Sequence, residues 1–332
     1  MTTEDESGTA TMTGDGDGDP TGDGDGDPTG DGDGDPGDGD GDPTGDGDGD
    51  PTGDGDGDPT GDGDGDGDGD GDGDGDECVP SEMVEITCDN IDNNCDGLID
   101  NVDQGNDGFC DCLVIGILGA TGFAPTSDFE AYLEDQGTTV TRTLLNQPNL
   151  VTPEFLAPYD VILIDRIQRG FSPEESAALE EFVKTGGFGV ITLIGYNFDN
   201  GNPGPERDRA NTVLAPFGLA YQGGYIHAGG GANVTPTFDQ NHEVSMGITD
   251  VNFAGGIEPV DNENQGMTSV FATVPQGDAG LAHETDMGGR VIVWGDEWLT
   301  FDSDWQGYAD VQSFWAQMLS WVKPQDFCAS PQ

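Results

Sequence analysis

Residues 14–76 consist of a TGDGDGDP repeat that slips into pure Gly-Asp, and this repeat restricts where the chain can fold. The repeat has no apolar side chain larger than proline, so nothing in it can offset the entropy that ordering its backbone would cost. Alternating aspartates repel one another and proline stiffens the chain, which favours an extended segment. We therefore expect residues 1–77 to be a disordered acidic linker, a stalk that holds the folded part away from a membrane or wall.

Negative charge extends beyond this linker. Of the 68 acidic residues, 29 precede Glu77, and the other 39 stand against all 8 Lys and Arg residues of the chain. Such a surface repels nucleic acid and anionic lipid, because phosphate binding requires clustered Lys or Arg. We therefore expect no nucleic-acid partner, and we favour calcium, other cations, or a cell-surface glycan or protein.

The six cysteines lie outside the predicted strands and helices of the large domain, which is typical of disulfides in an oxidising compartment. They are Cys78, Cys88, Cys95, Cys110, Cys112 and Cys328. Reduced surface thiols are one alternative. Zinc is another, but Cys110 and Cys112 are separated by one residue where a zinc knuckle needs two to four. Among the 15 possible connectivities, we favour a Cys112–Cys328 pair, because these two residues bracket the large domain.

No run of about 20 apolar residues is present, so we expect no transmembrane helix. The first residues, MTTEDESGTA, have no apolar signal core either. This conflicts with the disulfides unless a signal or lipoprotein segment lies upstream of this numbering, or export uses another route. We therefore expect an extracytoplasmic protein, either secreted or an outer-surface lipoprotein.

The stretch CDNIDNNCDGLIDNVD, residues 88–103, fits an EF-hand-type calcium loop that begins at Asp92. In such loops, positions 1, 3 and 5 point at the ion, glycine at position 6 makes the turn, and position 7 offers its carbonyl. Cys95, at position 4, faces away from the ion and is free to form a disulfide. An Asx-rich turn cluster braced by disulfides would explain the same residues without metal. The predicted calcium ligands are Asp92, Asn94, Asp96, Leu98, Asp100 and Asp103.

The same stretch resembles the Cys/Asp-rich metal-binding motif of myxobacterial-type surface proteins, where it often adjoins low-complexity linkers. In that family the Asp and Asn residues are taken to hold calcium, and the matching positions here are Asp92, Asn94, Asp96 and Asp100. Asp103 replaces the usual bidentate Glu at position 12, and its shorter reach argues against tight binding.

From Leu113 onward, apolar runs alternate with helical patterns. Continuous apolar strands joined by helices are typical of a parallel sheet covered on both faces. Residues 223–280 are rich in glycine and predict loops and short antiparallel strands. We expect a three-layer, flavodoxin-like, mostly parallel α/β sheet. Its strands are predicted at 113–120, 139–145, 159–165, 187–196 and 290–298, and its helices at 126–137, 172–186, 206–218 and 309–322.

Polar residues follow several of these strands, at the edge where α/β proteins bind ligands. The candidates for this cleft are Thr121, Asp165, Arg166, Tyr196, Asn197, Asp296 and Glu297, with His242 a further candidate. Capping and loop tethering would explain them without a ligand. A carbohydrate-acting or other hydrolase would instead use Asp165, Asp296, Glu297 and His242, and would require two carboxylates with raised pKa values to converge in one pocket.

The glycines of GILGATG, residues 116–122, also suggest a dinucleotide-binding turn. The pattern then breaks at Ala124 and Pro125, and no acidic residue ends the second strand where a ribose would be held. We therefore do not predict nucleotide binding.

The order of elements, the segment GGRVIVWGDEWLTFDSDW and the helix QSFWAQMLSWV resemble the class I glutamine-amidotransferase-like superfamily, especially its ThuA-like branch, over residues 113–323. The resemblance implies an amidotransferase-like fold. Enzymes of that superfamily attack an amide with a Cys at the turn after the fourth strand. Here that turn reads IGYNF without a Cys, and no G-x-S-x-G motif supplies a serine, so we expect no glutaminase activity.

These observations predict four segments: an acidic linker (1–77), a Cys-rich EF-hand-like calcium module (78–112), an amidotransferase-like domain (113–323) and a C-terminal tail (324–332). The corresponding function is an extracytoplasmic, surface-tethered calcium-binding protein whose α/β domain serves binding or architecture. A hydrolase acting in the α/β cleft is the alternative.

Overall fold

The computed structural model describes residues 78–104, 109–122, 124–195, 201–226, 233–263 and 267–325. The predicted linker, Tyr196, Asn197 and Cys328 therefore lie outside the described residues. The helices are α1 (Ser127–Asp135), α2 (Pro153–Leu156), α3 (Pro173–Lys184), α4 (Pro203–Leu214), α5 (Asp302–Gly307) and α6 (Val311–Val322). The strands are β1 (Val114–Leu118), β2 (Thr139–Thr143), β3 (Val161–Ile164), β4 (Gly189–Thr192), β5 (Leu219–Tyr225), β6 (Thr237–Phe238), β7 (Ile257–Asp261), β8 (Thr268–Val274), β9 (Gly277–Glu284) and β10 (Arg290–Trp294).

The large sheet has the strand order β2-β1-β3-β4-β10-β9-β8-β6. Strands β2, β1, β3, β4 and β10 are parallel neighbours, whereas β9, β8 and β6 continue the sheet in antiparallel fashion. The order 2-1-3-4 in the parallel half is the flavodoxin-like order. The expected α/β class and mostly parallel sheet are therefore confirmed.

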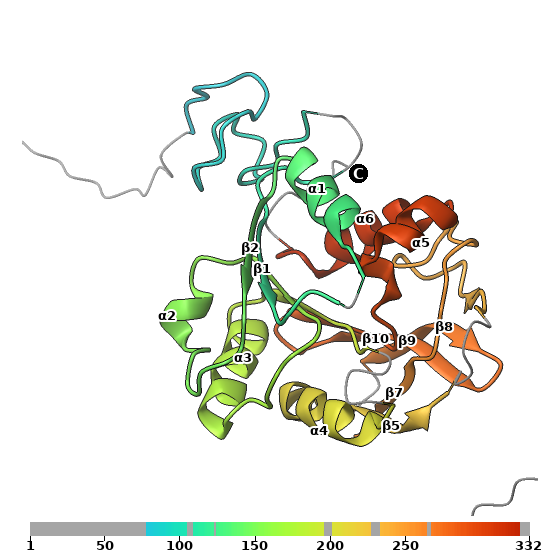
Figure 1. Ribbon diagram of the computed structural model, residues 1–332. Coiled ribbons are helices and arrows are strands. Elements are labelled where there is room, and N and C mark those ends of the chain that lie inside the picture. Colours follow the sequence, from blue (N-terminus) through green and yellow to red (C-terminus); the bar gives the residue numbers. More distant parts are fainter. Residues whose placement is uncertain are drawn as a thin grey trace, which may run out of the picture. The chain divides into compact units, whose positions relative to one another are not determined.

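Helices cover both faces of this sheet, which gives three layers (Figure 1). Successive strand residues point to opposite faces, so Ile115 and Ile117 of β1 pack in the core beneath α1 and α6. Leu118 packs in the core that α2, α3 and α4 share. Because both faces are buried, the strands read as continuous apolar runs in the sequence.

The predicted strands at 113–120, 139–145, 159–165, 187–196 and 290–298 all form, each shorter than its apolar run. The α3 helix begins as predicted, because Ser172 accepts a hydrogen bond from the Glu175 N–H and Pro173 occupies the first turn. Within the glycine-rich region 223–280, where short antiparallel strands were expected, β7 pairs with β5 in a separate two-stranded sheet.

Two disulfides hold the cysteine module, Cys78–Cys95 and Cys88–Cys112, and Cys110 is also disulfide-bonded. The pairing of Cys112 with Cys328 is therefore wrong. Instead, Cys112 pairs with Cys88 of the same module. Val102 and Phe109, which lie between these two cysteines in the sequence, are buried in the same core as β1. This packing returns the chain to Cys88, with a Cα–Cα separation of 5.4 Å from Cys112. The disulfide predicted for Cys95 is confirmed.

Candidate metal centre and buried carboxylates

The predicted calcium loop forms the turn that its sequence requires. The Asp92 carboxylate accepts hydrogen bonds from the N–H groups of Gly97 (2.8 Å) and Asp96 (3.2 Å). Gly97 has φ = +92°, a backbone region that favours glycine. The loop therefore closes around its first aspartate, as position 6 of an EF-hand-type loop demands.

The polar side chains inside this loop satisfy one another. The Asp96 carboxylate accepts hydrogen bonds from the Leu98 N–H (2.9 Å) and from the side-chain amides of Asn94 (3.1 Å) and Asn101 (2.9 Å). Burial raises the pKa of Asp96, but these hydrogen bonds outweigh it and the pKa is lowered. This network is the Asx-rich turn cluster that the sequence offered as an alternative to a metal.

Three carboxylates converge beside this loop. Glu85, Asp89 and Asp100 each place one carboxylate oxygen within 4.8 Å of the others, in a group that could hold a metal ion. Only Asp100 belongs to the predicted ligand set. The carboxylates of Asp92, Asp96 and Asp103 are not part of this acidic cluster. Asn94 touches it through its backbone N–H, which Glu85 accepts, and Leu98 stays a predicted carbonyl ligand.

Local backbone geometry positions the acidic cluster. Asp100 has φ = +52°, and its carboxylate accepts hydrogen bonds from the N–H groups of Asp89 (2.9 Å) and Asn90 (2.9 Å). The Glu85 carboxylate accepts the N–H groups of Asn93 (3.1 Å) and Asn94 (3.2 Å). The Cys88–Cys112 disulfide fixes the residue next to Asp89. The three carboxylates are thus held in place by backbone donors on separate turns.

The electrostatics of the acidic cluster favour a cation. Glu85 and Asp100 are each only 2% exposed, and burial raises the pKa of Glu85. Residues 78–112 contain no Lys, Arg or His that could neutralise the converging carboxylates. Oxygen-only ligand sets of this kind suit hard divalent cations.

A second group of buried charges lies where the parallel strands end. Asp165, directly after β3, forms an ion pair with Arg142 of β2 at 2.7 Å, and Arg142 also pairs with Glu130 of α1 at 3.0 Å. Burial raises the pKa of Asp165 to about 6, against the lowering effect of Arg142. The other Asp165 oxygen, Oδ1, accepts no hydrogen bond from a described residue.

Glu297, after β10, lies in the same group. Its Oε2 is 3.5 Å from Nε of Arg166. Burial raises the pKa of Glu297 to about 8; Arg166 lowers it, whereas Glu206, Asp296 and Asp165 raise it further. Glu206 of α4 also accepts the Gly195 N–H at 2.8 Å. The fold therefore brings together Asp165, Arg166 and Glu297, three of the predicted cleft residues.

The other cleft candidates are placed differently. Asp296 is fully buried, and its carboxylate accepts N–H groups from Ala254, Glu297 and Trp298, which makes it a loop tether. Thr121 is exposed. The His242 ring bonds Ser269 at 2.8 Å and packs against Trp321, at the end of α6, so it is not gathered with the carboxylates. Tyr196 and Asn197 fall outside the described ranges.

Sequence reasoning missed Glu85 and Asp89 in the metal centre, and Arg142 and Glu206 at the end of the strands. Asp89 directly follows Cys88, so its place next to a disulfide was the available signal. Glu206 lay in a predicted helix, and nothing in the helical pattern marked it as buried.

No family model matches this sequence, and no curated protein matches it. Solved structures with a similar fold include a cytoplasmic protein from Salmonella typhimurium, at 16% identity and a TM-score of 0.49, covering 64% of this chain and 99% of that chain. A ThuA-like protein from Bacteroides uniformis matches at 10% identity and a TM-score of 0.42, covering 63% and 90%. A glutamine amidotransferase from Thermotoga maritima matches at 8% identity and a TM-score of 0.36, covering 62% and 82%.

Proposed function

We propose that this chain is an extracytoplasmic calcium-binding protein in which the cysteine module holds the ion and the α/β domain serves binding or architecture. The observation that carries the proposal is the acidic cluster of Glu85, Asp89 and Asp100, whose oxygens lie within 4.8 Å of one another. Three like charges at this spacing repel one another, and a dication bound between them turns that repulsion into attraction.

Calcium is the preferred ion for two reasons. Calcium accepts oxygen ligands in irregular geometry, whereas magnesium demands a near-ideal octahedron of ligands. The two disulfides support an oxidising, extracytoplasmic compartment, where calcium modules typically bind at roughly 0.1–1 mM. Among the described residues, no helix is long and apolar enough to span a bilayer. Attachment to the surface through the acidic linker, as a secreted protein or a lipoprotein, is part of the proposal.

Calorimetric titration of the full chain with calcium tests this function. We expect Asp89→Asn and Glu85→Gln to weaken binding about tenfold, because each removes a charged ligand. Asp92→Asn should have a smaller effect, because the Asp92 carboxylate is occupied by backbone N–H groups. Glu82→Gln is the matched control, since Glu82 lies in the same module outside the acidic cluster. Equal heats in all variants would assign calcium uptake to the linker and remove the proposed site.

The hydrolase alternative is favoured by one observation, the raised pKa values of Asp165 and Glu297 within one group. Against it, Asp165 is 7% exposed, Glu297 is 1% exposed, and each is paired with an arginine. His242 lies elsewhere. A glycosidase activity on nitrophenyl glycosides that disappears in Glu297→Gln would establish the alternative instead.

A further inference from the structure

Two cavities lie between the cysteine module and the α/β domain, at the edge of the sheet where the parallel strands begin. The first has a volume of about 330 Å³ and the second about 530 Å³, and Asn90 and Pro324 line both. Val114 and Thr139, which start β1 and β2, line the second cavity. The two cavities adjoin at Asn90 and Pro324. They are together named here the interface groove.

The charge in the interface groove is negative. Asp100, Asp111 and Asp160 line the second cavity, and none of the described residues lining either cavity is Lys, Arg or His. Asp160 uses Oδ2 to accept the Val114 N–H at 2.8 Å. Burial raises the pKa of Asp160, and the nearby Asp100 raises it further, against the lowering effect of the Val114 hydrogen bond.

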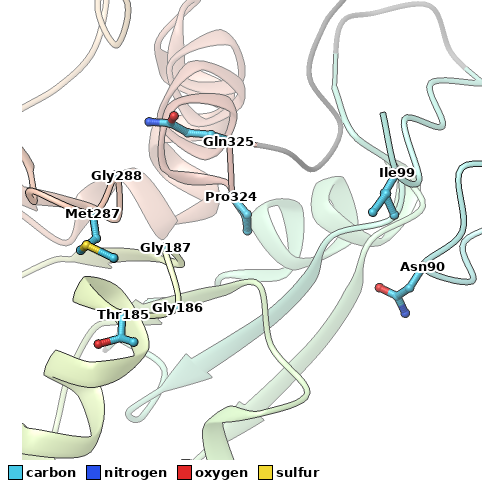
Figure 2. A pocket seen from close by; sticks show the side chains of 9 residues that line it. All are labelled: Asn90, Ile99, Thr185, Gly186, Gly187, Met287, Gly288, Pro324 and Gln325. Carbon is cyan, nitrogen blue, oxygen red and sulfur yellow. The ribbon is translucent and has the colours of Figure 1, made fainter. Parts of the chain in front are cut away.

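Apolar side chains form part of the lining of the groove. Figure 2 shows Ile99 and Asn90, from the module, across the first cavity from Met287, with Pro324 between them. Ile99 is 38% exposed and Met287 is 68% exposed, although both are large aliphatic side chains. Tyr159 and Phe188 add aromatic surface in the second cavity. Ile99 and Met287 therefore offer an incoming apolar group a contact on each side of the first cavity.

We propose that the interface groove binds an extended segment of a partner protein in which a Lys or Arg side chain is flanked by aliphatic residues. The basic group is held by Asp160, and the aliphatic residues pack between Ile99 and Met287. Charge complementarity selects this occupant. A second copy of this chain, with its net charge of -60, is repelled, as are nucleic acids and anionic lipids.

The proposal does not depend on calcium, although Asp100 belongs to both the acidic cluster and the groove. The test is therefore made in the presence of a chelator, so that failure of peptide binding and failure of calcium binding are separate results. The probe is a rhodamine-labelled peptide, acetyl-Gly-Leu-Arg-Leu-Gly, and its counterpart has Gln in place of Arg. Binding to the full chain is followed by fluorescence anisotropy.

We expect the Arg peptide to bind and the Gln peptide to bind up to about fivefold more weakly, the upper effect of a partly exposed ion pair. Asp160→Asn should weaken the Arg peptide by a similar factor, because Asn keeps an oxygen for the Val114 N–H and loses the charge. Glu243→Gln, which removes an equal charge from an exposed position outside the groove, should bind as the wild type does.

A second variant keeps the test independent of the Asp160 hydrogen bond. Ile99→Lys puts a positive charge on the module wall of the groove, at a partly exposed position that tolerates substitution, and should also weaken the Arg peptide. Circular dichroism checks that both variants are folded. Equal binding of the Arg peptide by wild type, Asp160→Asn and Ile99→Lys would show that the peptide adsorbs to the acidic linker, and would overturn the proposal. Absence of binding would overturn it as well.

Discussion

Two glycines explain how carboxylates come to be buried where the parallel strands end. A Cβ on Gly119, after β1, would lie 2.2 Å from Oδ1 of Asp165, and one on Gly195, after β4, would lie 2.8 Å from Oε1 of Glu297. Gly119 also has φ = +133°. Gly119 belongs to GILGATG, the segment that suggested a dinucleotide-binding turn. Its missing side chain leaves space for the Asp165 carboxylate.

Replacing Glu297 tests whether its burial costs stability at neutral pH. Its pKa is about 8 in the folded protein and near 4.5 when exposed, so the folded state holds the proton more tightly. The free energy of unfolding should therefore fall as pH rises from about 4.5 to 8, and level off above 8. Glu297→Gln lacks this titration, so its stability relative to wild type should rise by about 3–4 kcal/mol between pH 5 and pH 8.

Urea unfolding of the full chain at several pH values measures this difference. Glu134→Gln, at an exposed position of α1, is the matched control and should follow the wild type across the range. If the Glu297→Gln and wild-type curves run parallel with pH, the carboxyl group is not protonated in the folded protein.

At the scale of elements, α3 shows how one side chain joins several segments. Glu175 completes the capping box with Ser172 and also accepts the N–H groups of Leu150 (2.8 Å) and Val151 (3.1 Å). Its carboxylate pairs with Arg169 at 2.6 Å. Although burial raises the pKa of Glu175, the Arg169 and backbone hydrogen bonds lower it to about 2. The start of α3 is thus tied to the loop that precedes α2.

We expect Glu175→Gln to destabilise the protein by about 3 kcal/mol at pH 7, because it breaks a buried ion pair and leaves Arg169 without its carboxylate partner. The folded pKa lies below the unfolded value, so this stability is present above pH 4.5 and disappears as pH falls toward 2. Chemical unfolding at pH 7 and pH 3 measures the effect. Glu174→Gln, exposed in the same turn, is the control, and a loss as small as in the control would contradict the assigned role.

The elements that were predictable are those that local sequence determines. The α3 helix carries its own cap, and the parallel strands are marked by apolar runs that result from burial on both faces. By contrast, α2 is only four residues long, and β5 pairs with β7 across about 40 residues of sequence. Such pairing depends on tertiary contacts, so the pattern between 223 and 280 could not reveal it.

At the scale of the whole molecule, the cysteine module and the α/β domain share a core, because Val102 and Phe109 pack with Leu113. The domain boundary at residue 112 remains a prediction.

The metal centre also depends on contacts between separate parts of the chain. Spacing in the sequence predicted a loop at Asp92, and that turn forms, but the acidic cluster depends on turns 15 residues apart, from Glu85 to Asp100. A local sequence motif cannot predict that carboxylates so far apart in the sequence come together in the fold.

Calcium should raise the melting temperature of the full chain if the acidic cluster binds it. At a calcium concentration ten times the dissociation constant, binding adds about 1.4 kcal/mol, which corresponds to roughly 3–5 °C for a domain of this size. Differential scanning fluorimetry with and without a chelator measures the shift. The triple variant Glu85→Gln, Asp89→Asn, Asp100→Asn should show no shift, and a shift equal to that of wild type would assign the effect to another part of the chain.

The pairing of β4 with β10 has a consequence for the order in which the chain folds during synthesis. Strand β4 can pair with β10 only after residues 290–293 have been synthesised, so the centre of the sheet cannot form before then. A chain that emerges amino-terminus first therefore delivers the acidic repeat and the cysteine module about 200 residues before that closure. During this interval β4 has an open edge. Both ends of the Cys78–Cys95 and Cys88–Cys112 disulfides are therefore synthesised while the domain behind them is still incomplete.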